Sequence, residues 1–256
     1  MSSSYSITHG QIKRLTRHNT PTIANSMGVL SQRKKTTGFN LEPTTDFMPE
    51  MGAMCGYAVT VKYQASQEKV EHAVDYLDYF KWMASLPAPK IVVIQDLDAP
   101  DGIVGSFWGE CNGNRHRAFG CVGTITDGAI RDLHEMKNAG FKALARRLCV
   151  APAYGKVIDY NCPVTVFGLQ IKPGELIHAD HHGFITIPPD VAPLLDEVSN
   201  QYDLAELEHI ITPCRRPGIT LEEVIAEEHA FQQRIQKLRS KIESVRSGKN
   251  EGMQIV

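Results

Sequence analysis

The chain has 256 residues, of which 42% are hydrophobic and 22% are charged, as in a globular protein with one large domain or two small ones. Its formal net charge of −2 argues against a general nucleic-acid binder, which usually carries a basic surface. No apolar run approaches the ~18 residues of a membrane span, and the first residues lack the apolar core of a secretion signal. We therefore expect no nucleic-acid partner and no membrane partner.

The six cysteines are scattered along the chain and form no C-x-x-C pair. This spacing gives no support to a zinc site or a redox motif. Free thiols are typical of a reducing compartment, so we expect a cytoplasmic protein.

The first 150 residues alternate between helical and strand patterns. Thr20 followed by Pro21 indicates a helix N-cap with proline at the first helical position. Val59, Val61 and Tyr63 alternate with other residues, which indicates a half-buried strand. In chain order we expect helices over 8–15 and 20–30, a strand over 56–65, a helix over 68–86, a strand over 90–98, a helix over 105–119, a strand over 121–126, a turn at Asp127-Gly128, a short helix from about Asp132 and a strand over 141–150.

Beyond Pro152 the pattern changes to short strands and then to helices. The final helix opens with a capping box from Thr220 to Glu223 and carries apolar residues at helical spacing. It is long for so small a body, so its apolar stripe suits an oligomer contact. The expected elements are strands over 162–171, 174–179 and 183–188, the last two joined as a hairpin by "DHHG", and helices over 188–198 and 220–245.

Strand–helix–strand units followed by hairpins predict a mixed α/β sandwich with helical extensions at both ends. We expect an N-terminal helical segment over 1–55, an α/β core over 56–200 and a C-terminal helical extension over 201–256.

Charged residues gather where two expected strands, over 90–98 and 121–126, reach their carboxyl ends. We expect these two strands to be parallel neighbours, and ligands commonly bind at this edge of a sheet and at helix N-termini. Mg²⁺ suits the edge because it takes one or two carboxylates and keeps waters and substrate oxygens at its other positions. The alternative is a surface ion pair within the group, worth at most about 1 kcal/mol. The group comprises Asp96, Asp98, Glu110, Asp127, Arg131, Asp132 and Glu135.

The stretch "HADHH" supplies residue types that bind metals, namely His178, Asp180, His181 and His182. It falls on the expected hairpin tip, where a tight turn would point the side chains in different directions. We interpret it as turn chemistry. No P-loop, dinucleotide fingerprint or G-x-S-x-G elbow is present.

The stretch "WGECNGNRHRAFGCVGTITDGAIRDLHE" resembles the signature of the RraA-like family, which includes 4-hydroxy-4-methyl-2-oxoglutarate/4-carboxy-4-hydroxy-2-oxoadipate aldolases and the regulator of ribonuclease activity A. The family's aldolase motif is an acid, twenty residues, Arg-Asp, two residues, and Glu or Asp. Glu110, Arg131-Asp132 and Glu135 have that spacing. Further on, "VFGLQIKPGELIHADHHGFITIP" resembles the family's strand, Pro-Gly-acid turn and hairpin. The resemblance covers roughly 56–188 and implies a swivelling β/β/α sandwich.

The resemblance also implies a role for each residue of the motif. Asp132 would be the direct ligand of Mg²⁺ or Mn²⁺, and Arg131 would contact the carbonyl oxygen of a pyruvate-like substrate. Glu110 would act through metal-bound water, and Glu135 would steady the site. Backbone N–H groups near Glu110 and Asn112 would hold the substrate carboxylate, in a binding set of Gly109, Glu110, Cys111, Asn112 and Arg131.

This sequence departs from the family pattern in two ways. Glu110 stands where the characterised aldolases usually have Asp, so its carboxylate reaches about one methylene further. The family aldolases also draw a Glu from the C-terminal region of a neighbouring subunit, and Glu223, Glu227 and Glu228 are all candidates here.

Cleavage of the C3–C4 bond of a 4-hydroxy-2-oxo acid leaves a pyruvate enolate, whose charge can be stabilised by a lysine Schiff base or by a bound metal. Between Ile91 and Lys137 there is no lysine before Lys137 itself, so the metal route fits better. We therefore expect a metal-dependent (class II) pyruvate aldolase-type lyase that releases pyruvate and a second oxo acid, with oxaloacetate decarboxylation as a side activity.

Two alternatives remain open at this point. A related lyase, such as a dehydratase of a sugar acid, would use the same metal and enolate chemistry. A non-catalytic regulator that binds a ribonuclease or a helicase is the other. The resemblance further implies a homotrimer or homohexamer with its sites at subunit contacts.

Overall fold

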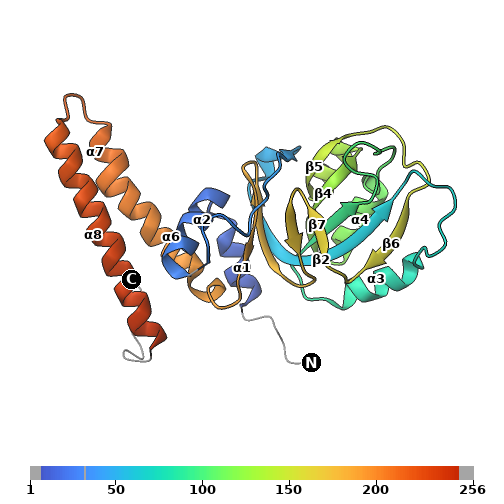
Figure 1. Cartoon of the computed structure of the whole chain (residues 1–256), viewed down its shortest axis with the longest axis horizontal. Coiled ribbons are helices and arrows are strands. Elements are labelled where there is room, and N and C mark those ends of the chain that lie inside the picture. The colour runs from blue at the N-terminus through green and yellow to red at the C-terminus, as the bar shows by residue number, and fades with distance from the viewer. Residues whose placement is uncertain (1–6, 32, 248–256) are drawn as a thin grey trace. The chain divides into compact units, whose positions relative to one another are not determined.

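The computed structural model describes residues 7–31 and 33–247. The chain folds as two compact units, which we call the sheet unit and the helical unit (Figure 1). Within the described residues, the sheet unit comprises Ile7–Thr20 and Gly38–Pro188, and the helical unit comprises Pro21–Thr37 and residues 189–247. The division at residues 55 and 200 that the sequence suggests stays a prediction.

Within the described residues, the sheet unit contains an eight-stranded mixed sheet of order β1-β5-β4-β3-β2-β9-β10, with β6 also paired to β2. The four central strands, β2 to β5, are parallel, and the others run antiparallel to their neighbours. A separate two-stranded sheet is formed by β7 and β8. The strands are β1 (Thr45–Asp46), β2 (Met54–Gln64), β3 (Lys90–Asp96), β4 (Cys121–Ile130), β5 (Lys142–Leu148), β6 (Lys156–Tyr160), β7 (Val164–Val166), β8 (Leu169–Ile171), β9 (Leu176–Asp180) and β10 (Gly183–Ile187).

Strand β2 organises the sheet because it has three partners. One edge of β2 pairs with β3, whereas the other edge pairs with β9 at its start and with β6 at its end. Nine of its first ten residues are buried, so the half-buried strand predicted from alternation is wrong: both faces of β2 are covered.

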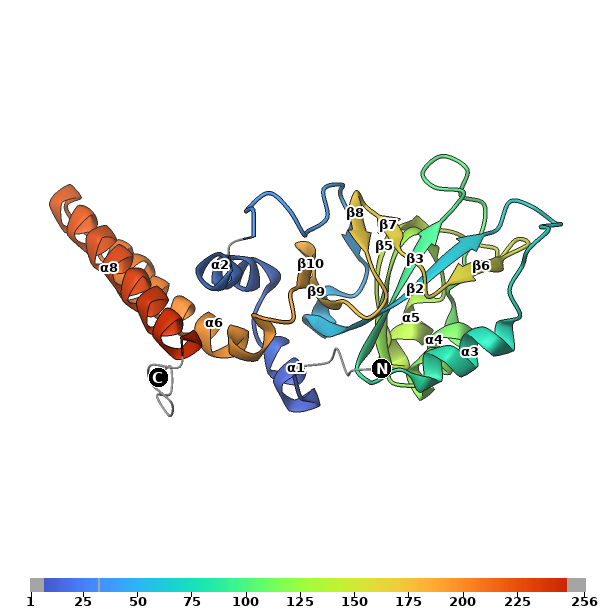
Figure 2. The same ribbon diagram turned by 60° about the horizontal axis from the view of Figure 1, so that its bottom comes forward.

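The sheet lies between a layer of helices and the small β7–β8 hairpin (Figure 2). Alternate residues of β3 point to opposite faces, as the two-residue period of a strand requires. Ile91 and Val93 pack in one core with Phe167 of the hairpin layer, and Val92 and Ile94 pack in the other. This layering confirms the predicted β/β/α sandwich.

Helices α3 (Tyr76–Ser85), α4 (Glu110–Ala118) and α5 (Leu133–Asn138) form the helical layer. Their core contains buried aromatic side chains, with Tyr79 and Trp108 fully inside. The hydroxyl of Tyr79 lies 2.8 Å from Nε2 of His116 on α4, so α3 and α4 are joined by a buried hydrogen bond as well as by packing. Helix α1 (His9–Leu15) precedes this core and begins with a capping box formed by Thr8 and Gln11.

The turn expected at Asp127-Gly128 is wrong, because β4 continues through both residues to Ile130. The pairing of β4 with β5 shifts between Thr126 and Ala129, which marks a bulge. At this bulge Oδ1 of Asp127 accepts the Asp96 N–H at 2.8 Å. A Cβ on Gly128 would lie 2.4 Å from Oδ2 of Asp96, so the Asp-Gly pair serves the close approach of two strands rather than a reversal of the chain.

Three expected helices begin later than their patterns suggest; the one expected over 188–198 begins at Ala192. Besides the two-residue β1, one strand was missed. The helix expected over 68–86 begins at Tyr76, since the side chain of Asp75 accepts the Leu77 N–H at 2.7 Å and caps the helix there. The helix expected over 105–119 begins at Glu110. The missed strand is β6, which is short and mostly half-buried, so its alternation is weak.

The helical unit contains α2 (Thr20–Leu30), α6 (Ala192–Glu206), α7 (Thr212–Cys214) and α8 (Leu221–Arg246). The predicted capping box of α8 is confirmed, because Thr220 Oγ1 accepts the Glu223 N–H at 3.2 Å and the Glu223 carboxylate accepts the Thr220 N–H at 2.9 Å. Helices α6 and α8 pack together, with the rings of Tyr202 and Phe231 edge to face at 5.9 Å. Across the described residues, no helix combines the length and the apolar character needed to cross a membrane.

The buried carboxyl groups of Asp96 and Asp127 should make stability depend on pH. Burial raises the pKa of Asp96 to about 6 and that of Asp127 to about 7, from an ordinary value of 3.8. The folded protein therefore holds protons that the unfolded chain releases, and this contribution to stability is present below pH ~4 and lost as pH rises through 6 to 7. We expect Asp127→Asn to raise the free energy of unfolding at pH 8 by roughly 1 to 3 kcal/mol. Urea denaturation at pH 4, 6 and 8 measures the difference, which should nearly vanish at pH 4.

A matched control is Asp98→Asn. The carboxylate of Asp98 accepts the N–H groups of Ala65 and Ser66, both at 2.8 Å, so removing its charge should lower stability at pH 8. If Asp127→Asn were also less stable than the wild type at pH 8, the argument from burial would be wrong.

Candidate active site

A cavity of about 660 Å³ opens in the sheet unit where β4 ends and α4 begins. This volume suits a small-molecule ligand. The family resemblance gives a role to seven residues, and six of them lie in the wall of this cavity: Gly109 to Asn112, Arg131 and Asp132. The lining comprises Tyr63, Ala73, Val74, Tyr76, Ser106, Phe107, Gly109, Glu110, Cys111, Asn112, Arg115, Arg131, Asp132, Pro152, Gly155, Lys156 and Val157.

Asp132 occupies an unusual backbone conformation that directs its side chain toward α4. Its φ of 57° and ψ of 48° are left-handed, a region that costs about 1–3 kcal/mol for a residue other than glycine. It precedes α5 without capping that helix, and its Oδ2 instead accepts the Glu110 N–H at 3.0 Å. The carboxylate thus caps α4, whose N-terminus carries partial positive charge that stabilises an anion.

Gly109 is required here by the close approach of the Asp132 carboxylate. A Cβ on Gly109 would lie 2.6 Å from Oδ2 of Asp132 and 3.4 Å from Nε of Arg131. Any other residue would push both charged groups away from the start of α4. The glycine before the acid in the sequence motif therefore has a steric explanation.

Arg131 lies beside Asp132 but is weakly paired with it. Its Nη1 is 3.5 Å from Oδ1 of Asp132, and both side chains are about a third exposed, so this ion pair contributes little to stability. Its Nε–H is buried and has no hydrogen-bond acceptor within residues 7–31 and 33–247. An arginine with a donor that the protein does not use is suited to hold an anionic oxygen of a ligand.

A hydrogen-bond network fixes the outer part of the wall. The Asn112 amide donates to the Phe107 carbonyl at 2.6 Å, and its Oδ1 accepts from the Tyr76 hydroxyl at 2.6 Å and from Nη1 of Arg115 at 3.2 Å. Burial raises the pKa of Tyr76 to about 12, so its hydroxyl stays a donor. The N–H groups of Cys111 and Asn112 belong to the first turn of α4, which has no intrahelical acceptors for them.

The structure adds cations to the cavity that the sequence did not identify. Arg115 and Lys156 join Arg131 in the wall, opposite only two acids, Glu110 and Asp132. Nζ of Lys156 donates to the carbonyl of Glu68. Lys156 was missed because β6 was missed, and the sequence signal for Arg115 is only its position on the same helix, five residues after the motif acid Glu110.

Four acids expected at this edge lie outside the cavity lining. Asp96 and Asp127 are buried at the β4 bulge, and Asp98 bonds the backbone of Ala65 and Ser66. Glu135 is exposed on α5, so the supporting role expected for it stays a prediction.

The three glutamates of α8 named as candidates for a neighbouring site have partners within the helical unit. Glu223 completes the capping box, Glu227 lies 3.0 Å from Nδ1 of His209, and Glu228 accepts from Gln232 at 2.8 Å. Which of them, if any, serves another subunit stays open to experiment.

The motif and the layered fold have counterparts among known proteins. A family model described as Aldolase/RraA matches residues 20–186, which is well over half of the chain. The chain belongs to the RraA-like family. The resemblance seen in the motifs is thereby confirmed, and the site described above carries the family's motif on this family's fold.

Individual members of the RraA-like family are only distantly similar to this chain. Protein DlpA of Legionella pneumophila is 27% identical over 184 residues, which are 70% of this chain but only 28% of DlpA. A protein of Halalkalibacterium halodurans named "Putative 4-hydroxy-4-methyl-2-oxoglutarate aldolase" is 26% identical over 161 residues, covering 59% of this chain and 75% of its own length. Among solved structures, Streptomyces coelicolor RraAS2 superposes with a TM-score of 0.60 at 18% identity over 80% of this chain and 98% of its own, which shows the shared fold alone.

Capping of α4 by Asp132 leads to a stability prediction. We expect Asp132→Ala to lower the free energy of unfolding by roughly 1 to 2 kcal/mol, because the cap is lost and alanine tolerates the left-handed conformation poorly. Asp132→Asn keeps an acceptor oxygen and tolerates that conformation, so it should remain close to the wild type. Urea denaturation of the three proteins at pH 7 measures this. Equal destabilisation of both variants would contradict the capping role.

Proposed function

We propose that this protein is a divalent-metal-dependent lyase that cleaves the C3–C4 bond of a 4-hydroxy-2-oxo acid, releasing pyruvate and a second oxo acid. The observation that carries the proposal is the convergence of Glu110, Arg131 and Asp132 on one cavity. The names of the aldolase relatives support the same reaction class at low sequence identity. Oxaloacetate decarboxylation is expected as a side activity, because it passes through the same enolate.

The donor set of the cavity fits a hard divalent cation. Asp132 would hold Mg²⁺ or Mn²⁺, with Glu110 in the same wall, and Mg²⁺ characteristically takes one or two carboxylates. The left-handed backbone of Asp132 and the missing Cβ at Gly109 both serve to place that carboxylate. When bound, the ion would polarise the 2-oxo group of the substrate as a Lewis acid.

The chain's own groups would bind and orient the substrate. The first-turn N–H groups of Cys111 and Asn112 would hold its carboxylate, as helix N-termini commonly do. The guanidinium of Arg131 would lie beside the carbonyl oxygen, where negative charge develops as the enolate forms.

Proton removal from the C4 hydroxyl is the step that starts bond cleavage. Glu110, which lines the cavity, would accept this proton, directly or through water. As the proton leaves, C4 becomes the carbonyl carbon of the second oxo acid. The electrons of the C3–C4 bond pass to the pyruvate fragment, which is released after C3 is protonated.

The first test is a comparison of wild type and Asp132→Asn, which keeps the cap. With Mg²⁺ or Mn²⁺, the wild type should release pyruvate from 4-hydroxy-4-methyl-2-oxoglutarate and from oxaloacetate, as followed with lactate dehydrogenase. EDTA should remove this activity and added metal should restore it. Asp132→Asn should lose at least 100-fold in kcat/KM while folding normally, since it lacks the charge that the ion requires.

Lys156 is the lysine in the wall of the cavity, so a Schiff base on its amine is the alternative to a metal mechanism. If pyruvate release survived EDTA, and borohydride with pyruvate added mass at Lys156, the enzyme would act through a Schiff base instead. Under the metal mechanism, borohydride leaves Lys156 unlabelled and EDTA stops turnover.

Arg115 gives a second test, on substrate charge. The cavity holds three cations against two acids, and Arg115 is oriented by Asn112 at its outer wall. We expect Arg115→Ala to raise KM 10-fold or more for 4-hydroxy-4-methyl-2-oxoglutarate, which has a second carboxylate, because an ion pair with that group is lost. KM for the monocarboxylate 4-hydroxy-2-oxopentanoate should change little. Equal effects on both substrates would show that Arg115 does not recognise the second carboxylate.

The other functions stay testable with the same protein. A sugar-acid dehydratase would release a 2-oxo acid other than pyruvate, so products are separated by chromatography. A regulator would bind a ribonuclease or helicase and show no metal-dependent turnover. The trimeric or hexameric assembly and the cytoplasmic location also stay predictions.

A further inference from the structure

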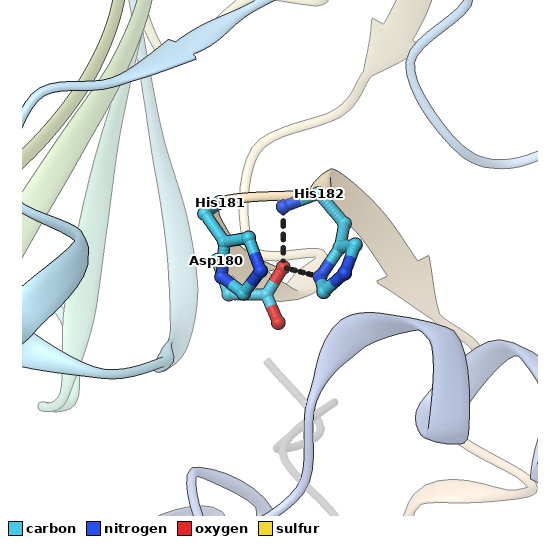
Figure 3. A group of neighbouring side chains, drawn as sticks. All are labelled: Asp180, His181 and His182. Carbon is cyan, nitrogen blue, oxygen red and sulfur yellow. Dashed lines mark hydrogen bonds and ion pairs between the residues drawn. The ribbon is translucent and has the colours of Figure 1, made fainter.

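The hairpin tip between β9 and β10 brings its polar side chains together, contrary to the expectation that a tight turn would separate them. Asp180 pairs with Gly183, so the turn consists of His181 and His182. The centroids of the two imidazole rings are 3.8 Å apart. One ligand atom from each of Asp180, His181 and His182 lies within 4.8 Å of the others, and Figure 3 shows the Asp180 carboxylate bonded to His182 at the turn, with His181 beside them.

The Asp180 carboxylate is rigidly held and charged. Its Oδ2 accepts the Thr20 N–H at 2.8 Å, and its Oδ1 accepts the His182 N–H at 2.8 Å. Although burial opposes it, these hydrogen bonds hold the pKa of Asp180 below its usual range. The carboxylate is only 5% exposed, so its position does not depend on solvent.

His182 is oriented by this carboxylate in the way that metal-binding histidines are oriented. Its Nδ1 lies 3.2 Å from Oδ1 of Asp180, so a proton on Nδ1 would point at the carboxylate and leave the Nε2 lone pair available. A histidine that binds a metal commonly donates its other N–H to a carboxylate, which fixes the tautomer and raises the basicity of the ligand nitrogen.

The reversal of the chain at this turn does not require imidazole side chains at positions 181 and 182. Gly183, with φ of 126°, and the bond from the His182 N–H to Asp180 already support the reversal of the chain. Both histidine side chains are exposed, and within the described residues the His181 ring contacts only that of His182. His178, the first residue of "HADHH", is buried and bonded to Thr20 and Leu15, so it is not part of this group.

We propose that His181 and His182 bind a transition-metal ion, represented by Zn²⁺, through one imidazole nitrogen each, with Asp180 as the group that positions His182. Imidazole nitrogens suit zinc, copper and nickel, whereas the carboxylates of the cavity suit Mg²⁺ and Mn²⁺. The two sites therefore differ in the ion they select. Water molecules would complete the coordination, and the exposed rings give the ion a direct path from solvent.

The test is titration of the full chain with Zn²⁺ by isothermal titration calorimetry at pH 7.5. The wild type should show a binding event that the double variant His181→Ala/His182→Ala lacks. Asp180→Asn keeps an acceptor for the turn but removes the charge beside His182, so it should bind 10- to 100-fold more weakly. His72→Ala is the matched control, because His72 is 92% exposed in its side chain and lies 4.0 Å from the equally exposed carboxylate of Glu71 rather than against a buried one, and it should bind as the wild type does.

Two further measurements keep the outcome unambiguous. The exposed thiols of Cys111 and Cys214 are present in every variant, so only the difference between variants reports on the hairpin. X-ray absorption at the zinc edge should show nitrogen ligands at ~2.0–2.1 Å in the wild type that the double variant loses. Circular dichroism without metal checks that each variant folds.

Equal zinc binding by the wild type and the double variant, or no zinc binding by the wild type, would overturn the proposal. The result does not depend on the proposed lyase activity. Asp132→Asn should keep the zinc-binding event while losing turnover, so failure of one proposal is distinguishable from failure of the other.

Discussion

The hydrogen bond from the Glu110 N–H to the Asp132 carboxylate is the contact on which the candidate site depends. It joins the end of β4 to the start of α4, and it requires a left-handed Asp132 and a residue without Cβ at Gly109. Because the helix N-terminus stabilises negative charge, one carboxylate can cap α4 and still face the cavity with its charge intact. The strained backbone is thus compensated by the cap that it makes possible, and Arg131 is placed beside that charge.

The acidic residues near the carboxyl ends of β3 and β4 have different surroundings, depending on whether they lie within a strand or just outside it. Asp96 and Asp127 lie within β3 and β4, and their carboxyl groups are buried against backbone at the bulge. Asp132 follows β4, and Glu110 opens α4, so both reach the cavity. A shift of a few residues along the chain therefore separates acids that support the sheet from acids that line the cavity. Composition alone does not distinguish these two groups.

Local signals in the sequence predicted much of the fold. The buried strand expected over 90–98, the capping box at Thr220 and the β9–β10 hairpin are all confirmed, because each depends on neighbouring residues only. The family motif likewise placed Glu110 and Asp132 in one site. What could not be predicted depends on distant segments. The β4 bulge needs Asp96 beside Gly128, and Lys156 enters the cavity wall only because β6 pairs with β2.

The sheet unit offers two polar groups with different donor chemistry. The cavity presents carboxylate oxygens next to cations, whereas the hairpin presents imidazole nitrogens supported by a buried carboxylate. Hard oxygen donors and softer nitrogen donors favour different ions. Cations in the wall of the cavity, Arg115 and Lys156 among them, further favour an anionic occupant there, because bound metal would add positive charge that a substrate with several carboxylates can balance. The group proposed at the hairpin consists of two exposed imidazoles and one buried carboxylate, a set that suits a metal ion rather than an organic anion.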